Sequence, residues 1–431
     1  MKYAACLVVS TALFSVGVAQ ADRSELYAKD VEFLLTELPR EAGHFFEVKK
    51  IDWGAVSEQF RTEVKSVQTG EEHLKLCSRL MARLRDGHAS IVQSKVNWPN
   101  ESHGRTWTGP GIHLLVTGDS VCIRQASSVA TQAGLKTGVR VEKIDGEPAL
   151  DWLKKKSASL ADLRGFSTEH QALYTACHAG LADWAGTTIA LEIAETGDQP
   201  RRIELTRSGG SNYVPLGPIF PPLGLKRYDR NTCGKTTSGY AYIHLRNIPG
   251  DLEIQLDKML ADLGEAPGLI LDMRANSGGG CDHEAVFGRF LPTGKNWGHY
   301  LSKGPNPFTG PMVIIVDAGV ASAGETVGGM FKEDGRAYMI GDSPTAGMSS
   351  SKKTVPLPSG LFSAHFSVFS NKARFNSGRG IEGIGVPPHE LVPYDPVELL
   401  AGVDTQIRRA EELLTKGFPE NVVQYEPPNS H

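Results

Sequence analysis

The stretch GLILDMRANSGGG, from Gly268 to Gly280, decides the fold of the carboxyl-terminal half of this chain. It begins with an apolar run and ends in glycines, a pattern typical of a buried parallel strand that enters a tight turn. The stretch PMVIIVDAGVASAGE, from Pro311 to Glu325, has the same pattern. Glycines let backbone N–H groups turn outward, as an oxyanion hole requires, and Ser322 on a strand-to-helix turn can present its hydroxyl at the same edge. Taken singly, each turn also fits an ordinary connection in an α/β domain, so the rest of the chain must decide.

The length and composition predict a globular protein with several domains. A chain of 431 residues is too long for one ordinary hydrophobic core, so two or three domains are expected. Hydrophobic residues make up 40% of the chain and charged residues 22%, which is typical of a water-soluble fold. The formal net charge is −4 and no polybasic stretch occurs, so the sequence predicts no nucleic-acid partner.

Residues 1–21 have the features of a cleaved signal peptide. Lys2 gives the positive start, an apolar run extends from Ala4 to Val18, and an Ala-x-Ala cleavage site ends at Ala21. The apolar run is short for a bilayer span, and polar residues follow it at once. We therefore predict export, cleavage after Ala21, and a mature protein in the periplasm or outside the cell with no membrane span.

The cysteines give no support for a metal site. Cys6 leaves with the predicted signal peptide, and five others remain in the mature chain: Cys77, Cys122, Cys177, Cys233 and Cys281. None of them forms a Cys-x-x-Cys pair or a Cys/His cluster, so we predict no zinc, no other metal and no cofactor. One or two disulfides with a free thiol left over are compatible with an oxidising compartment, and spacing does not select the pairs.

Hydrophobic periodicity divides the mature chain into successive regions. Residues 22–98 place apolar side chains three and four positions apart, which predicts a helical region. Residues 109–208 favour short strands with an inserted helical part. Residues 225–415 alternate strands and helices in the βαβ rhythm of a parallel sheet, interrupted by a hairpin around Ser359. Residues 416–431 form a polar tail.

Several ordered motifs give the chain a family resemblance. The segment from Ala133 to Pro148 resembles the PDZ signature, in which an Ala-Gly-Leu turn precedes a strand that ends in Ile-Asp-Gly. With Ala321 to Glu325, Asp334 to Ala337 and Gly380 to Pro387, the chain resembles the C-terminal-processing (tail-specific) serine peptidases, and within them the tricorn-like branch. The resemblance implies an α/β multidomain fold with an N-terminal helical region, a PDZ-like module and a βαβ peptidase core of the ClpP/crotonase type.

The resemblance also implies a function and a nucleophile. The protein is expected to be an exported serine endopeptidase that cleaves unfolded or C-terminal peptide segments through an acyl-enzyme on Ser322. Its partners are then peptides or unfolded proteins, while homo-oligomer formation stays open. The resemblance assigns the oxyanion donors to the backbone of Gly278 or Gly279 and of Ala323.

The catalytic base depends on the branch. The processing branch uses a lysine where this chain has Met348, and a thioether cannot take up a proton usefully. The tricorn-like branch uses a histidine and a glutamate, which the resemblance assigns to His88 and Glu382. The glutamate acts on the imidazole directly or through a bridging serine, but Gly87, beside His88, has no hydroxyl for that role.

Other charged residues offer rival or structural roles. Lys352 and Lys353 follow Met348 closely and remain alternative bases, although adjacent lysines before a hairpin more often face solvent. Asp272 and Arg274 are expected to form ion pairs at a strand end. Glu325 falls in the first turn of the helix after Ser322, where a carboxylate interacts favourably with the helix dipole.

A second hypothesis is a peptidase-like scaffold that binds peptides or apolar ligands without turnover. Met348 in place of the lysine is the argument for it. Retention of Ser322, His88, Glu382 and the glycine run is the argument against it.

Overall fold

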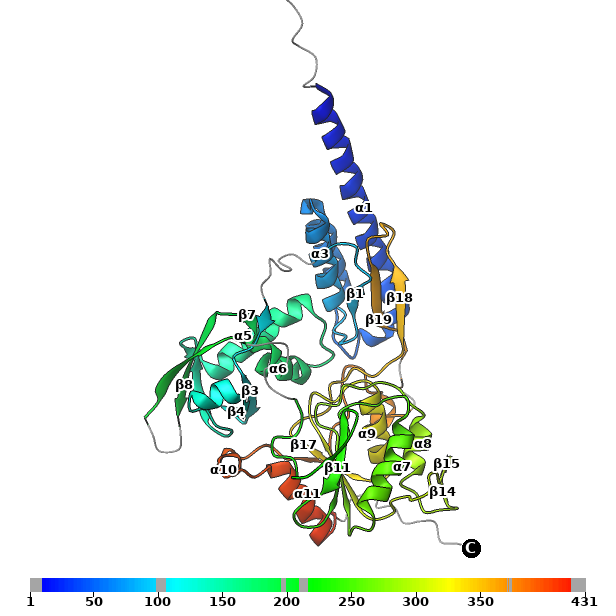
Figure 1. Cartoon of the computed structure of the whole chain (residues 1–431). Coiled ribbons are helices and arrows are strands. Elements are labelled where there is room, and N and C mark those ends of the chain that lie inside the picture. The colour runs from blue at the N-terminus through cyan, green and yellow to red at the C-terminus, as the bar shows by residue number, and fades with distance from the viewer. Residues whose placement is uncertain are drawn as a thin grey trace, which may run out of the picture. The chain divides into compact units, whose positions relative to one another are not determined.

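The computed structural model has a mixed α/β fold, as the family resemblance implied (Figure 1). It describes residues 10–97, 106–194, 199–208, 216–369, 371 and 374–419, with side chains from residue 23 onward except at position 128. Residues 1–9 and the side chains of 10–21, in the predicted signal peptide, lie outside the described part, as do residues 420–431 of the tail. Among the helices that are described, none combines the length and the apolar character of a membrane span.

The chain divides into two compact units, each of which is considered by itself. The first unit contains Met1–His103, Ala161–Phe166 and Ser350–Ser370. The second contains Gly104–Leu160, Ser167–Ser349 and Asn371–His431.

Helices form most of the first unit, as the apolar spacing predicts. They are α1 (Ser10–Ala42), α2 (Trp53–Glu63) and α3 (Gly70–Ala82), with single 3-10 turns η1 (Gly43–Phe45) and η2 (Val64–Ser66) after α1 and α2. The helix α3 begins at a capping box, in which Thr69 and Glu72 satisfy each other's backbone N–H groups. The helix α1 starts twelve positions before the Asp22 expected from the sequence, at Ser10.

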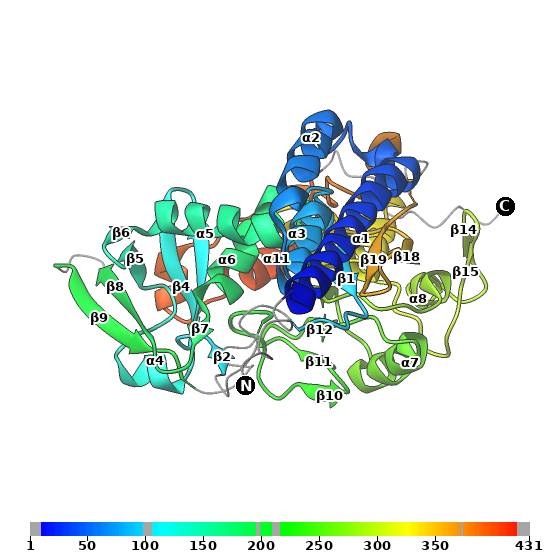
Figure 2. The same cartoon turned by 90° about the horizontal axis from the view of Figure 1, so that it is seen from above.

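The predicted hairpin around Ser359 is confirmed, and it belongs to the first unit. Its strands β18 (Lys352–Pro356) and β19 (Ser363–Ser367) pair antiparallel, and β1 (Ser90–Val92) joins β19 (Figure 2). A buried carboxylate holds the hairpin to the helices: Asp30 accepts hydrogen bonds from Ser359 N at 2.7 Å and lies 2.9 Å from His73 Nε2. Local periodicity gave no sign of this association.

An antiparallel sheet forms the first part of the second unit, in the order β3-β4-β5-β8-β9 with β6 on β5. Its strands are β3 (Ile112–Thr117), β4 (Ser120–Ala126), β5 (Arg140–Ile144), β6 (Glu147–Pro148), β8 (Thr188–Ala194) and β9 (Arg201–Thr206). The helical elements of this part are α4 (Ser128–Gln132), α5 (Ala149–Leu163), whose last three residues belong to the first unit, α6 (Glu169–Cys177) and η3 (Ala179–Leu181). Two further short strands, β2 (Trp107–Thr108) and β7 (Asp183–Trp184), form a separate antiparallel pair.

A seven-stranded sheet forms the rest of the second unit, in the order β10-β11-β12-β13-β16-β17-β20. Its strands are β10 (Lys226–Tyr228), β11 (Asn231–Lys235), β12 (Ala241–His244), β13 (Leu269–Asp272), β16 (Met312–Val316), β17 (Tyr338–Gly341) and β20 (Glu390–Leu391). The pairs from β12 to β20 are parallel, which confirms the predicted βαβ rhythm. The other elements are α7 (Leu252–Leu263), α8 (His283–Gly288), β14 (Asn296–Trp297), β15 (Tyr300–Leu301), α9 (Ala323–Glu333), η4 (Asn376–Gly378), α10 (Pro396–Leu400) and α11 (Thr405–Lys416).

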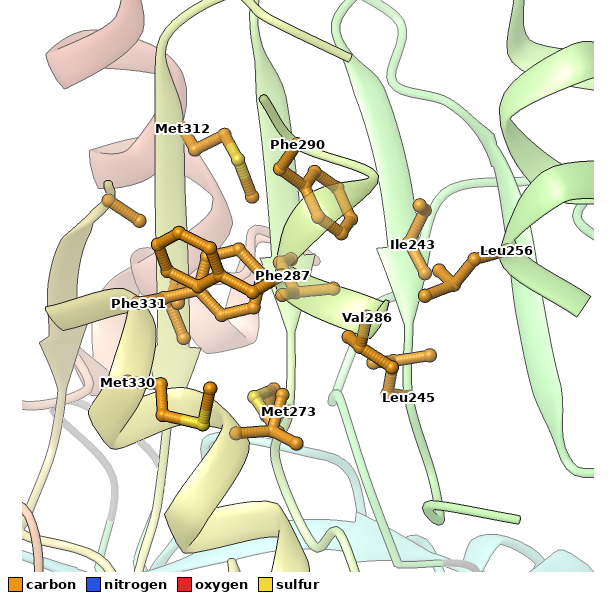
Figure 3. Packing of buried hydrophobic residues seen from close by; sticks show 14 of the residues in the cluster. Ile243, Leu245, Leu256, Met273, Val286, Phe287, Phe290, Met312, Met330 and Phe331 are labelled. Carbon is orange, nitrogen blue, oxygen red and sulfur yellow. The ribbon is translucent and has the colours of Figure 1, made fainter. Parts of the chain in front are cut away.

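Both faces of this parallel sheet are covered, which explains the continuous apolar runs. Leu269 and Leu271 of β13 point into the core under α7, α8 and α9, whereas Ile270 points into the core under α11. In the larger core, Phe287 stacks on Tyr300 at 4.1 Å between ring centroids and also contacts Phe331 (Figure 3). The strands that lead to the glycine run and to Ser322 are therefore packed between two buried apolar clusters.

The expected ion pair of Asp272 and Arg274 is confirmed and is part of a larger buried cluster. All three side chains of Asp272, Arg274 and Asp404 are almost completely buried, and Arg274 donates to both carboxylates. Tyr394 Oη accepts a further bond from Arg274 at 2.8 Å. Asp404 also caps α11 by accepting from Gln406 and Ile407 N–H.

The suggested disulfides are not present. All five cysteines within the described residues are free thiols, four of them buried and Cys281 partly buried. The stability of the fold therefore rests on apolar packing and buried polar clusters.

The buried cluster around Arg274 generates a stability prediction. Replacing Asp404 by Ala leaves the guanidinium without one of its two carboxylates, so we expect the free energy of unfolding to fall by about 3–5 kcal/mol in urea denaturation. The variant Arg61→Ala, which breaks a solvent-exposed pair with Glu32, should change little. Equal losses in both variants would contradict this account.

Candidate active site

Ser322 lies on a sharp turn between β16 and α9. Its backbone has φ 56° and ψ −126°, a conformation that residues other than glycine rarely adopt. Its N–H lies 3.1 Å from Glu325 Oε2 and 3.1 Å from the Met348 carbonyl oxygen. The side chain is half-buried at the start of α9. The turn thus holds the hydroxyl at the carboxyl edge of the sheet, where the sequence predicted it.

A buried carboxylate, Glu325, fastens this turn to the loop after β17. Besides the Ser322 N–H, it accepts bonds from Thr345 Oγ1 at 2.6 Å, Gly347 N at 2.7 Å and Met348 N at 2.8 Å. Burial raises the pKa of Glu325 to about 8, while the hydrogen bonds from Thr345, Gly347 and Met348 oppose this shift. The sequence gave Glu325 only a role at the helix dipole, because the loop that it binds is remote in the sequence.

The glycine run packs directly against Ser322. A Cβ atom added to Gly278 would lie 2.7 Å from Ser322 Cβ, and one added to Gly279 would lie 2.0 Å from the Ile248 carbonyl oxygen. Both glycines also have positive φ, so no larger residue fits at either position. The carbonyl of Asn276 accepts from Ala321 N at 2.9 Å, which joins the two turns.

The backbone donors near Ser322 are not equivalent. The N–H of Gly278 already donates to Asn276 Oδ1 at 2.8 Å, so it is occupied within the protein. Among the described residues, the N–H of Gly279 donates to no acceptor, and Gly279 is exposed. The N–H of Ala323 is the first of α9, a position without an acceptor inside the helix. Of the three predicted oxyanion donors, Gly279 and Ala323 are the two that remain available.

Met348 lies in the same loop, at the position where a lysine base was expected. Its Sδ accepts from Gln171 Nε2 at 2.7 Å, and its backbone holds Ser322 and Glu325 as described above. The side chain carries no proton acceptor of useful basicity, so its role in this loop is one of packing and positioning.

Glu382 lies in the same unit as Ser322 and is buried, with 2% of its surface exposed. It accepts a hydrogen bond from Ser167 Oγ at 2.9 Å, and its charge helps to raise the pKa of Glu325. Ser167 was missed by the sequence analysis. It is separated from Glu382 by 215 positions and stands just before α6, where nothing local marks it as more than a residue near a helix start.

His88 belongs to the first unit, on the turn between α3 and β1. Its side chain is 13% exposed, and Nδ1 lies 3.9 Å from Asp86 Oδ1, beyond hydrogen-bonding distance. Asp86 accepts from His88 N at 2.9 Å and from Ser367 N at 2.8 Å, which fixes the turn to β19. Burial lowers the pKa of His88 to about 4; the charge of Asp86 opposes this shift and that of Lys352 adds to it.

The rival lysines are in the first unit as well. Lys353 forms ion pairs with Glu37 and Glu41 of α1, at 3.3 Å and 3.2 Å. Lys352 is exposed on β18. The second unit thus brings together Ser322, the glycine run, Glu325 and Glu382, while the three candidate bases, His88, Lys352 and Lys353, are all carried by the first unit.

Comparisons with known proteins relate the part of the chain around Ser322 to a peptidase family. Residues 239–392, which include Ser322 and Glu382, match peptidase family S41. The tricorn protease homolog 2 of Streptomyces coelicolor is 25% identical over 414 residues, covering 87% of this chain and 31% of that protein, so this chain spans about a third of that relative. The carboxyl-terminal-processing protease of Picosynechococcus sp. is 22% identical over 387 residues, covering 85% of this chain and 84% of the relative.

A solved structure has the same fold. The crystal structure of mature CPAF superposes with a TM-score of 0.67 at 12% sequence identity, covering 93% of this chain and 99% of that one. The similarity at this identity concerns the fold alone. Residues 239–392 therefore form a domain of peptidase family S41, and most of the chain is similar in sequence to a carboxyl-terminal-processing protease.

Proposed function

We propose that this protein is an exported serine endopeptidase that cleaves unfolded or C-terminal peptide segments through an acyl-enzyme on Ser322. The observation that carries the proposal is the turn at Ser322, with φ 56° and ψ −126° at the start of a helix and the glycine run against it. Strained backbone of this kind aims a nucleophile at a strand edge and is uncommon without a functional reason.

The proposed chemistry is acyl transfer. Ser322 Oγ attacks the peptide carbonyl while His88 takes its proton, and the amides of Gly279 and Ala323 donate to the oxyanion. The imidazolium then gives the proton to the leaving amine. Water attacks the acyl-enzyme with His88 again acting as the base, which releases the carboxylate product. No metal or cofactor enters this sequence of steps.

The role of Glu382 is to orient the base through a hydroxyl. Gly87, beside His88, has no hydroxyl that could bridge the imidazole and Glu382. Ser167 can take this bridging role, because its Oγ already donates a hydrogen bond to Glu382. A serine in this position accepts from an imidazole N–H while it donates to the carboxylate, so it transmits the negative charge without direct contact. Ser167 is therefore proposed as a positioning residue.

The antiparallel sheet of the second unit is proposed to act as the PDZ-like module. Its outer strands in the hydrogen-bonding order are β3 and β9, and a peptide can add to such an edge as a further strand. Backbone pairing would hold an unfolded segment with little dependence on its side chains. Export is proposed from the signal-like residues 1–21, with a mature terminus at Asp22.

Reaction with a fluorophosphonate probe tests the nucleophile. The wild type should be labelled at Ser322, and Ser322→Ala should not be labelled, because the probe bonds only to an activated hydroxyl. The variant Ser277→Ala, which removes an exposed serine of the glycine run, is the matched control and should be labelled as the wild type is. A folded wild type without labelling would instead favour the non-catalytic peptide-binding scaffold.

The base is tested by substitution and by pH. His88→Ala should lower kcat/KM by about 10⁴-fold or more. Because the pKa of His88 is lowered to about 4, its neutral form persists at neutral pH, and activity should be lost only as the pH falls through about 4. Lys352→Ala should stay active and move this acid limb to higher pH, since the Lys352 charge lowers the histidine pKa.

If Lys352→Ala or Lys353→Ala were inactive while His88→Ala kept its activity, the assignment of the base to His88 would be wrong. Circular dichroism of each variant shows whether a loss of activity reflects a loss of folding.

Substitution of Ser167 tests the hydroxyl relay. Ser167→Ala should lower kcat by about 10- to 100-fold with little change in KM, because a misplaced base affects the chemical step more than substrate binding. Ser167→Thr, which keeps the hydroxyl, should recover part of the rate. Ser159→Ala, at an exposed position of α5, should have no effect. A parallel loss of stability and of both kinetic constants would indicate a merely structural role.

A further inference from the structure

Met348 differs from the other methionines in its exposure. The chain has eight methionines, and seven lie within the described residues. Six of these are at most 4% exposed: Met81, Met259, Met273, Met312, Met330 and Met339. Met348 is only half-buried, so it is the one methionine among the described residues with appreciable surface open to solvent. Susceptibility of methionine to oxidation follows such exposure.

Met348 also helps to hold the turn that carries Ser322. The backbone carbonyl of Met348 accepts the Ser322 N–H, and its N–H donates to Glu325 at 2.8 Å. Its Sδ takes the Gln171 amide at 2.7 Å. A chemical change at this sulfur therefore acts directly on the loop that holds Ser322.

A chain of hydrogen bonds leads from the same sulfur to Glu382. Gln171 donates to Met348 Sδ through Nε2 and accepts from Ser167 N through Oε1, at 2.8 Å. Ser167 Oγ in turn donates to Glu382 at 2.9 Å. The two ends of the Gln171 amide thus couple Met348 to the serine that contacts the carboxylate. Displacing this amide moves Ser167 as well.

Neighbouring contacts make the loop dependent on this segment. Thr168 Oγ1 donates to the Ala346 carbonyl at 2.9 Å, and His170 Nε2 lies 2.7 Å from the Thr345 carbonyl. A Cβ atom added to Gly347 would lie 2.6 Å from Thr168 Cγ2. The packing between residues 167–171 and 345–348 is close, so a change in the Met348 side chain acts on both segments.

We propose that Met348 is an oxidation site through which peroxides inactivate this protein. In the step, the peroxide transfers one oxygen atom to Sδ; the thioether is oxidised to the sulfoxide and the peroxide is reduced to water or an alcohol. The new S–O bond uses a sulfur lone pair, so the sulfur is no longer the acceptor that Gln171 Nε2 now has. Loss of this contact loosens Gln171 from the loop and thereby disturbs the support of both Ser322 and Ser167. The effect on catalysis rests on the proposed function.

The one cysteine that is not fully buried among the described residues, Cys281, does not compete well for the oxidant. Cys281 follows the glycine run and is partly buried, but burial raises the pKa of its thiol to about 12. At neutral pH it is almost entirely protonated, and the protonated thiol reacts slowly with peroxides. Oxidation of a thioether has no such requirement, so Met348 is the favoured target.

The experiment treats the whole protein with hydrogen peroxide and follows three quantities over time. Mass spectrometry of the tryptic peptide Ala337–Lys352 measures sulfoxide at Met348, with buried Met339 in the same peptide as an internal reference. The rate of fluorophosphonate labelling measures the state of Ser322, and amide hydrogen exchange measures order in residues 167–171 and 345–348. We expect sulfoxide at Met348 first, labelling slowed by about 10- to 100-fold, and faster exchange in both segments.

Controls separate this site from other oxidation. Met348→Leu, compared with its own untreated rate, should resist peroxide, whereas Met339→Leu and Cys281→Ser should remain as sensitive as the wild type. Treatment with methionine sulfoxide reductases should restore labelling, because these enzymes reduce only sulfoxides of methionine. Equal oxidation of Met339 and Met348, or complete oxidation of Met348 with unchanged exchange and labelling, would overturn the proposal.

The two proposals fail in different ways. If the untreated protein is not labelled by the probe, the serine peptidase proposal fails, and the exchange measurement still decides whether oxidation of Met348 releases the loop. If the untreated protein is labelled and peroxide has no effect, the oxidation site alone is wrong.

Discussion

The geometry of the candidate site depends on the buried carboxylate of Glu325. Three backbone N–H groups and one hydroxyl, from Ser322 and from residues 345–348, converge on its two oxygens. Backbone with positive φ at a residue such as Ser322 is costly, by about 1–3 kcal/mol, and persists only where the surroundings hold it. Glu325 supplies that hold from within the same helix, since it lies one turn after the serine. The proposed nucleophile is thus positioned by a residue to which the proposed mechanism assigns no proton transfer.

The remaining parts of the site are arranged around this anchor by backbone contact. The glycine run touches Ser322 so closely that a single methyl group would collide with it, and the Asn276 carbonyl joins the two turns by accepting from Ala321 N. The Asn276 side chain occupies the Gly278 N–H, which leaves Gly279 and Ala323 as outward donors. Small residues here are a steric requirement of two turns that share one space.

Local patterns in the sequence were enough to predict the sheet and the turn that carries Ser322. The apolar run at Leu269 to Leu271 and its counterpart at Met312 to Val316 predicted parallel strands buried on both faces, and the structure has them in register. The contacts of Ser167 with Glu382, and of Glu325 with residues 345–348, were not predicted, because they join segments whose spacing carries no periodic signal. Free cysteines where disulfides were considered illustrate the same limit, since pairing depends on three-dimensional proximity.

The hairpin of β18 and β19 has a consequence for biosynthesis. Ala364 and Phe366 of β19, with Phe362 before it, are completely or almost completely buried in the apolar cluster of the first unit, whose other members come from residues 27–89 and from 355 and 357. A ribosome makes the helices of that unit first, yet their shared interior stays open until about five sixths of the polypeptide has emerged. The apolar surface of the amino-terminal helices therefore stays exposed to solvent until the hairpin has been synthesised. A prematurely terminated product would keep this surface exposed and would be prone to aggregation and proteolysis.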